Sequence, residues 1–173
     1  QPDITFAQEL SLGVGGLTLR LVHAPGHPAD ELVLYDPETA TLWAGDKLSD
    51  VEIPFVSDAL VPYERNLEML VGWELGALVP GHGRPTADPA EARRRVDNDR
   101  RYLATRHAEV AAAVAAGLTL IETVARCAAQ PLPCPGNEGM HRLNVESAYG
   151  PIKAIRGVGY LYAQMPEGAR SGQ

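Results

Sequence analysis

Three short segments decide how the chain is expected to fold: HAPGH (residues 23–27), AGD (44–46) and PGHG (80–83). In each of them a glycine directly precedes a histidine or a carboxylate, and these residues are His27, Asp46 and His82. An apolar run typical of a strand leads into each segment. Three side chains able to bind a metal ion are therefore expected at strand ends, where neighbouring strands of one sheet bring them together.

The residues around these segments predict a small sheet and one helix. In residues 17–21 leucines alternate with Thr18 and Arg20, as in a strand with one buried face. Residues 47–61 show no clear period and are expected to form a loop that lines a pocket. A helix that starts at Pro62 is expected after this loop. Strands are expected at residues 4–10, 17–23, 31–35, 41–44 and 77–79.

The second half of the chain carries helix signals. Asp88 as N-cap and Pro89 at the first helical position predict a long helix that ends before Gly117. Thr119 and Glu122 have the spacing of a capping box, which predicts another helix to about residue 129.

The order of these elements predicts an α/β protein built of helix and sheet layers. We expect residues 1–87 to form the sheet-containing domain and residues 88–165 to form a mostly helical C-terminal region. Asn137 is expected to cap a short last helix. The composition of residues 166–173 predicts a disordered tail.

The composition is that of a globular protein, with 45% hydrophobic and 21% charged residues. The net charge of −7 argues against nucleic acid or an anionic membrane as the main partner. The sequence shows neither a long apolar run nor a charged-then-apolar leader, so we expect a cytoplasmic protein. Because the first residue is Gln1 and not Met, the chain is expected to begin inside a longer gene product.

Some conspicuous residues outside the three segments have ordinary structural explanations. Cys127 and Cys134 match neither a CxxC redox motif nor a zinc knuckle. We expect free thiols, with a single disulfide as the open alternative. His141 is expected to be a surface or partly packed histidine, and Trp43 and Trp73 are expected in the core.

Each of the three segments also has an ordinary explanation when it is taken alone. A packed turn explains His27, a turn or cap explains Asp46, and a hinge between glycines explains His82. Their conjunction is harder to obtain by chance, because all three groups follow a glycine at the end of an apolar run. A metal site is the hypothesis that explains them together.

In this order the segments resemble the C-terminal half of a metallo-β-lactamase-fold hydrolase. In that superfamily a strand enters an HTPGH-type turn, a hairpin delivers a GD carboxylate, and a GHG loop closes the site. The resemblance implies half of an αββα sandwich followed by a mostly helical C-terminal region. It implies that His27 is a zinc ligand, that Asp46 is the catalytic carboxylate bridging two metals, and that His82 is the last histidine ligand. His23 would support the ligands or the turn.

Compared with that superfamily, the chain lacks one characteristic motif. The HxHxDH motif, which supplies the other ligands in that superfamily, does not occur in the sequence. The implied function is that of a zinc-dependent metallo-hydrolase in truncated form, expected to be inactive alone. Two zinc ions are expected in the intact protein, with zinc partial or absent in this chain, and the substrate is expected to be a small molecule. The alternative is a non-catalytic binding or assembly module derived from the same fold.

Two further expectations concern the surroundings of the site. Phe55 and Tyr63 flank the 47–61 loop and are candidate substrate contacts. In the implied sandwich each half supplies one sheet, so one face of this chain's sheet would be bare. The apolar runs at 32–35 and 77–79 are typical of strands buried on both faces. We expect the bare face to bind the missing N-terminal half or a second copy of the chain.

Overall fold

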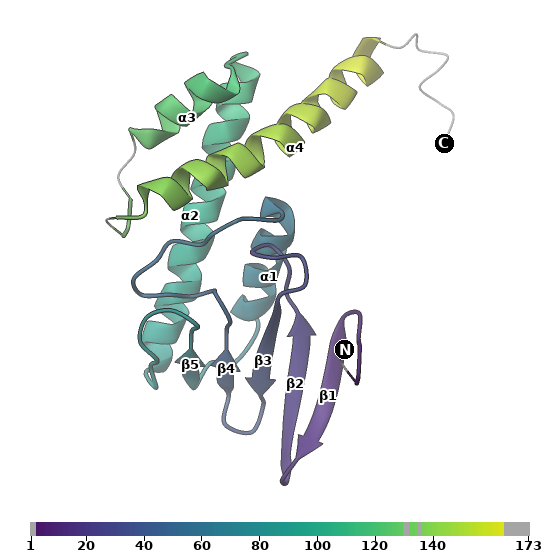
Figure 1. The fold of residues 1–173 in the computed structure, drawn as a ribbon, viewed down its shortest axis with the longest axis vertical. Coiled ribbons are helices and arrows are strands. Elements are labelled where there is room, and N and C mark those ends of the chain that lie inside the picture. The colour runs from purple at the N-terminus through teal and green to yellow at the C-terminus, as the bar shows by residue number, and fades with distance from the viewer. Residues whose placement is uncertain (1–2, 130–131, 135, 165–173) are drawn as a thin grey trace.

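The computed structural model describes residues 3–129, 132–134 and 136–164, with side chains described as far as residue 154. The expected disordered tail, residues 166–173, lies outside the described residues. The order of elements confirms the expected α/β class (Figure 1). These elements are β1 (Glu9–Val14), β2 (Leu17–His23), β3 (Leu32–Asp36), β4 (Thr41–Trp43), α1 (Leu60–Val71), β5 (Ala77–Val79), α2 (Pro89–Ala115), α3 (Leu120–Ala128) and α4 (Glu138–Gln164).

The five strands form one sheet in chain order. Neighbouring strands are antiparallel except β4 and β5, which are parallel because the crossover through α1 returns the chain to the same end of the sheet. The expected strand from Ile4 was wrong, since β1 begins at Glu9. Val14 pairs with Leu17, so the hairpin continues through the glycine-rich segment to a two-residue turn. The other four strands lie within one residue of the expected ranges.

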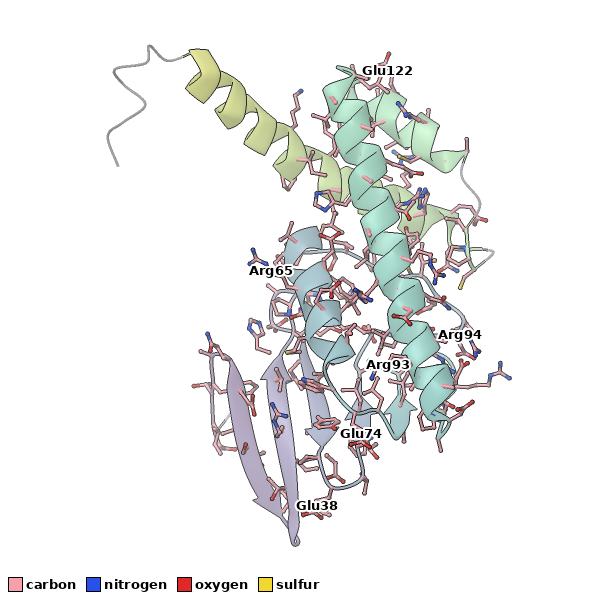
Figure 2. The ribbon with its side chains drawn as sticks, turned by 180° about the vertical axis from the view of Figure 1, so that it is seen from behind. Glu38, Arg65, Glu74, Arg93, Arg94 and Glu122 are labelled. Carbon is pink, nitrogen blue, oxygen red and sulfur yellow. The ribbon has the colours of Figure 1, made fainter. Side chains whose placement is uncertain are left out.

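Helices α1 and α2 lie on one side of the sheet (Figures 1 and 2). The side chains between them and the sheet are fully buried, and they include Val33, Leu42 and Leu78 from the strands and Leu67 and Val96 from the helices. Each buried side chain of this size contributes roughly 1.5–3 kcal/mol. The core cluster contains side chains from both sides of residue 88, and the expected domain division there stays a prediction.

The opposite face of the sheet carries a row of apolar side chains across all five strands. The row is in register and consists of Leu10, Leu21, Leu34, Trp43 and Val79. Within the described residues no helix covers this face (Figure 1), and Trp43 is 37% exposed there. The expected placement of Trp43 in the core was therefore wrong. The expected inner face of β2 was wrong as well, because the helices cover the face of Val22 and leave the leucine face open.

The expected helix signals are confirmed, with two differences. The Asp88 side chain caps α2, and Thr119 and Glu122 form the capping box of α3. Helix α1 begins two residues before Pro62. Helix α4 is 27 residues long and runs through Pro151, so the expectation of a short last helix was wrong. In the part of the chain that the structure describes, no helix combines the length and the apolar character needed to cross a membrane.

Two arginines near the start of α2, Arg93 and Arg95, make structural contacts. Arg93 donates hydrogen bonds to the carbonyls of Leu70, Val71 and Trp73, which caps the C-terminal end of α1 (Figure 2). Arg95 is buried and donates to the carbonyl of Arg84 at 2.9 Å.

Candidate metal centre

The three residues singled out in the sequence lie together at one end of the sheet. His27 lies between β2 and β3, Asp46 follows β4, and His82 follows β5. The Asp46 carboxylate lies between the two imidazoles. Nε2 of His27 is 3.2 Å from Oδ2, and Nε2 of His82 is 3.4 Å from Oδ1. Each histidine therefore faces a different carboxylate oxygen, which is how a carboxylate that bridges two cations would be placed.

The orientation of His27 is fixed by a carbonyl on its far side. Its Nδ1 lies 2.9 Å from the carbonyl oxygen of Phe55, an atom that can only accept a hydrogen bond. The proton must therefore be on Nδ1, and in the neutral ring the lone pair is on Nε2, the atom that faces Asp46. The Phe55 ring also packs against the imidazole, with centroids 5.2 Å apart.

His82 is held through its backbone and is more exposed. The N–H of Gly81 donates to the carbonyl of Gly45 at 2.6 Å, which ties the loop after β5 to the loop after β4. A Cβ at position 81 would lie 2.7 Å from Oδ1 of Asp46, so only glycine lets the two loops approach this closely. The His82 side chain is 57% exposed.

A buried asparagine on α4 supports the His27 orientation from a distance. Oδ1 of Asn144 accepts the N–H of Val56 at 2.7 Å, and Nδ2 donates to the carbonyl of Pro54 at 2.7 Å. The amide thus holds the backbone on both sides of Phe55, whose carbonyl orients His27. Asn144 was missed in the sequence, because an asparagine inside a helix carries no local signal of a contact with residues about ninety positions earlier.

Beneath Asp46 lies a cluster of buried charged groups that the sequence analysis also missed. Lys47 has no exposed surface, and its ammonium pairs with the Glu31 carboxylate. Burial lowers the pKa of the Lys47 ammonium, although Glu31 acts in the opposite direction. The carboxylate of Asp99 on α2 accepts the N–H of Leu48 at 3.1 Å. Burial raises the pKa of Asp99 to about 7, against the opposing effects of that N–H, Lys47 and Arg95.

The raised pKa of Asp99 predicts a pH dependence of stability. Between about pH 4 and pH 7 the folded chain binds more protons at this carboxyl than the unfolded chain, so the free energy of unfolding falls as the pH rises. Above about pH 7 the full cost of ionising Asp99 is present, up to about 4 kcal/mol at ~1.4 kcal/mol per pKa unit. Asp99→Asn is expected to be more stable than wild type at pH 8, and to lose that advantage by pH 4.5.

Urea denaturation at pH 4.5, 6 and 8 measures this difference. Asp97→Asn on the same helix is the matched control, because the Asp97 carboxylate is partly exposed and pairs with Arg100. If Asp99→Asn and Asp97→Asn show the same difference from wild type at each pH, the buried ionisation of Asp99 does not control this window.

Two of the other expected site residues make structural contacts. His23 donates from Nε2 to the carbonyl of Ala29 at 2.7 Å, which holds the turn that carries His27. Tyr63 is fully buried, with Gly26 against its Cβ and the Lys47 ammonium over its ring. The expectation that Tyr63 contacts substrate is thereby corrected, because it lies on the inner face of α1. Phe55 is half-buried beside His27, and its contact with substrate stays a prediction.

The residues at this site fit a divalent metal of the zinc type in their donor chemistry. Two imidazole nitrogens and two carboxylate oxygens face one another, which are ligands that zinc accepts. Within the described ranges, no group of three or more His, Cys, Asp or Glu side chains surrounds a common point closely enough to hold one ion. The arrangement instead pairs one nitrogen with one oxygen on each side of Asp46, so these three side chains would give each of two metal positions two ligands, fewer than zinc usually takes.

The 47–61 loop lines a polar cavity of about 320 Å³ on the α2 side, which agrees with the expectation that this segment lines a pocket. Asp50, Arg84 and Arg95 lie along its wall, and Asp50 accepts hydrogen bonds from both the backbone and the guanidinium of Arg84. These bonds join the loop after Asp46 to the loop after His82.

The expected free thiols are confirmed, since Cys127 and Cys134 are unpaired. Cys134 lines the cavity beside the 47–61 loop.

Comparison with known proteins gives partial matches. No family model matches the sequence. A linear primary-alkylsulfatase from Pseudomonas sp. (strain ATCC 19151) is 27% identical over 93 residues, which are 50% of this chain and 18% of that protein. The structure is similar to a metallo-β-lactamase family protein from Thermus thermophilus, with a TM-score of 0.67 and 20% identity, covering 92% of this chain and 50% of that chain.

The structure of this chain is also similar to that of the stereoselective inverting sec-alkylsulfatase Pisa1 from Pseudomonas sp. The TM-score is 0.70 and the identity 17%, and the match covers 86% of this chain and 26% of that chain. These likenesses confirm the expected metallo-β-lactamase fold. The chain spans half or less of the length of these relatives, which is consistent with a partial metallo-β-lactamase fold.

Proposed function

We propose that the chain supplies half of a two-zinc site in a metal-dependent hydrolase. The observation that carries this proposal is the placement of the Asp46 carboxylate between Nε2 of His27 and Nε2 of His82, one nitrogen for each oxygen. His27 and one oxygen would hold the first metal, and His82 and the other oxygen would hold the second. The non-catalytic alternative does not by itself explain why these three side chains converge.

Each residue of the chain has a chemical task in this proposal. Zinc, when bound, lowers the pKa of a water ligand to about 7 and polarises the scissile bond. The two imidazoles act as neutral nitrogen donors, and the Phe55 carbonyl keeps the proton of His27 on Nδ1. The Asp46 carboxylate neutralises part of the charge of both cations.

The remaining ligands would come from another polypeptide segment. Three side chains divided between two metal positions leave each position short of the three or four ligands that zinc usually takes. We therefore propose that the chain is inactive alone and works with the missing N-terminal half of the domain, or with a second copy of itself. Because two of its relatives are alkylsulfatases by name, sulfate esters are the first substrate class to test.

Zinc binding by the chain alone tests the proposal. We expect calorimetry to show weak binding at well below two ions per chain, because neither position is complete. His82→Ala is expected to weaken this binding. His107→Ala is the matched control, since His107 lies on α2 and pairs with Glu64. Two tightly bound ions per chain, or equal losses in both variants, would contradict the proposed division of ligands.

A further inference from the structure

The Glu31 carboxylate contacts both Asp46 and Lys47. One oxygen, Oε1, accepts the backbone N–H of Asp46 at 3.2 Å, and the other, Oε2, pairs with the ammonium of Lys47. The carboxylate therefore lies directly beneath the backbone of the residue that stands between the two histidines. It makes no contact with His27 or His82 among those the structure describes, so its effect on them passes through Asp46.

Lys47 fixes the position of that carboxylate. Its side chain has no exposed surface, and its ammonium lies 4.7 Å above the centroid of the Tyr63 ring, which is buried as well. A buried ion pair usually contributes little net stability compared with apolar side chains of the same volume. The pair is thus poorly explained by stability alone. What the Glu31–Lys47 pair does provide is a carboxylate that is held in one position, where it accepts the hydrogen bond from the Asp46 N–H.

The backbone around Asp46 adopts a conformation that needs such support. Leu48 has φ +61°, in the left-handed region that a leucine seldom adopts. Its N–H is held by Asp99, and the N–H of Asp46 is held by Glu31. Two buried carboxylates from different parts of the chain therefore hold alternate N–H groups of the same short loop. The intervening residue, Lys47, has its charge close to both carboxylates.

We propose that Glu31, held in place by Lys47, is a positioning residue for Asp46 and keeps its carboxylate between His27 and His82. This inference rests on the proposed function, because the value of a fixed Asp46 is the metal affinity that it gives. Groups that orient a metal ligand from outside typically contribute about 10–100-fold to metal affinity.

A matched pair of double variants tests the inference on the chain itself. Glu31→Gln with Lys47→Met removes both buried charges but keeps a side-chain oxygen that can accept the Asp46 N–H. Glu31→Leu with Lys47→Met removes the same charges and also the acceptor. Both variants replace an ion pair with neutral groups of similar volume, so both are expected to fold. Melting curves establish that the two variants are comparably folded.

Two measurements then separate positioning from a merely structural role. Amide hydrogen exchange of Asp46 is expected to be slow in wild type and in the glutamine variant, and faster in the leucine variant. Zinc titration followed by NMR is expected to give a dissociation constant about 10–100-fold higher in the leucine variant, with near wild-type affinity rescued by glutamine. Equal Asp46 exchange and equal zinc affinity in both folded variants would overturn the inference.

The two proposals fail in different ways. If wild type shows no zinc-dependent change at His27 and His82, the proposed function fails, and Asp46 amide exchange still decides whether Glu31 positions the loop. If wild type binds zinc at these histidines and the leucine variant binds it equally well, the positioning role fails and the proposed function stands.

Discussion

Asp46→Ala is expected to lower hydrolysis by about a thousandfold or more in a protein that carries this chain together with the missing half of the domain. The substitution removes the carboxylate that stands between the two histidines. A bound metal stabilises transition-state charge by several kcal/mol, and ~1.4 kcal/mol corresponds to a factor of ten in rate. Steady-state kinetics on sulfate, thio-, carboxylic and phosphate esters measure the loss, with the chain alone expected to show no hydrolysis.

Asp30→Ala is the matched control, because Asp30 is an exposed carboxylate on the same turn as His27. It removes one negative charge near the site and is expected to leave the rate within a few-fold of wild type. Asp46→Asn separates charge from shape, since it keeps the size of the side chain but cannot neutralise two cations. Retained activity in Asp46→Ala would assign the chemistry to other residues.

The uncovered face of the sheet is expected to make the chain alone associate with a second copy or retain an N-terminal fragment. The row of apolar side chains across the five strands includes Leu34 and the 37% exposed Trp43. Apolar patches of several hundred Å² on a soluble protein usually mark an interface. Light scattering combined with intact-mass measurement distinguishes a dimer from a complex with a fragment.

Leu34→Lys and Trp43→Lys are expected to weaken a dimer formed through this face by roughly tenfold to a hundredfold. This range follows from about 1.5–3 kcal/mol for burying one large apolar side chain. Ile121→Lys is the matched control, because Ile121 is an exposed isoleucine on α3, away from the sheet. A monodisperse monomer with no retained fragment and no dye-binding apolar surface would show that the bare face needs no partner.

The parts of the fold that the sequence predicted depend on local signals. The caps at Asp88 and Thr119 act within one turn of their own helices, so their meaning does not change with the rest of the fold. The grouping of His27, Asp46 and His82 was also predictable, since each side chain follows a strand and the three strands belong to one sheet. The resemblance to a known superfamily added the roles that local signals cannot provide.

The parts that the sequence did not predict depend on contacts between distant residues. In β2 the alternating pattern favoured the leucine face as the buried one, and only the docking of α1 and α2 decides that Val22 lies inside. Lys47 would be expected at the surface, because only the fold brings Glu31 to it. His141 was expected to be a surface or partly packed histidine, yet it is buried and contacts Tyr102 and the Cys127 carbonyl.

The zinc titration becomes the most direct test of the central claim when it is followed at each of the five histidine rings. With the ring nitrogens labelled, zinc is expected to shift the Nε2 signals of His27 and His82 and to leave those of the other three histidines in place. Asp46→Ala is expected to weaken both shifts together, because its carboxylate is shared between the two positions. Zinc-dependent shifts at other histidines, with His27 and His82 unchanged, would contradict the assignment of the metal centre.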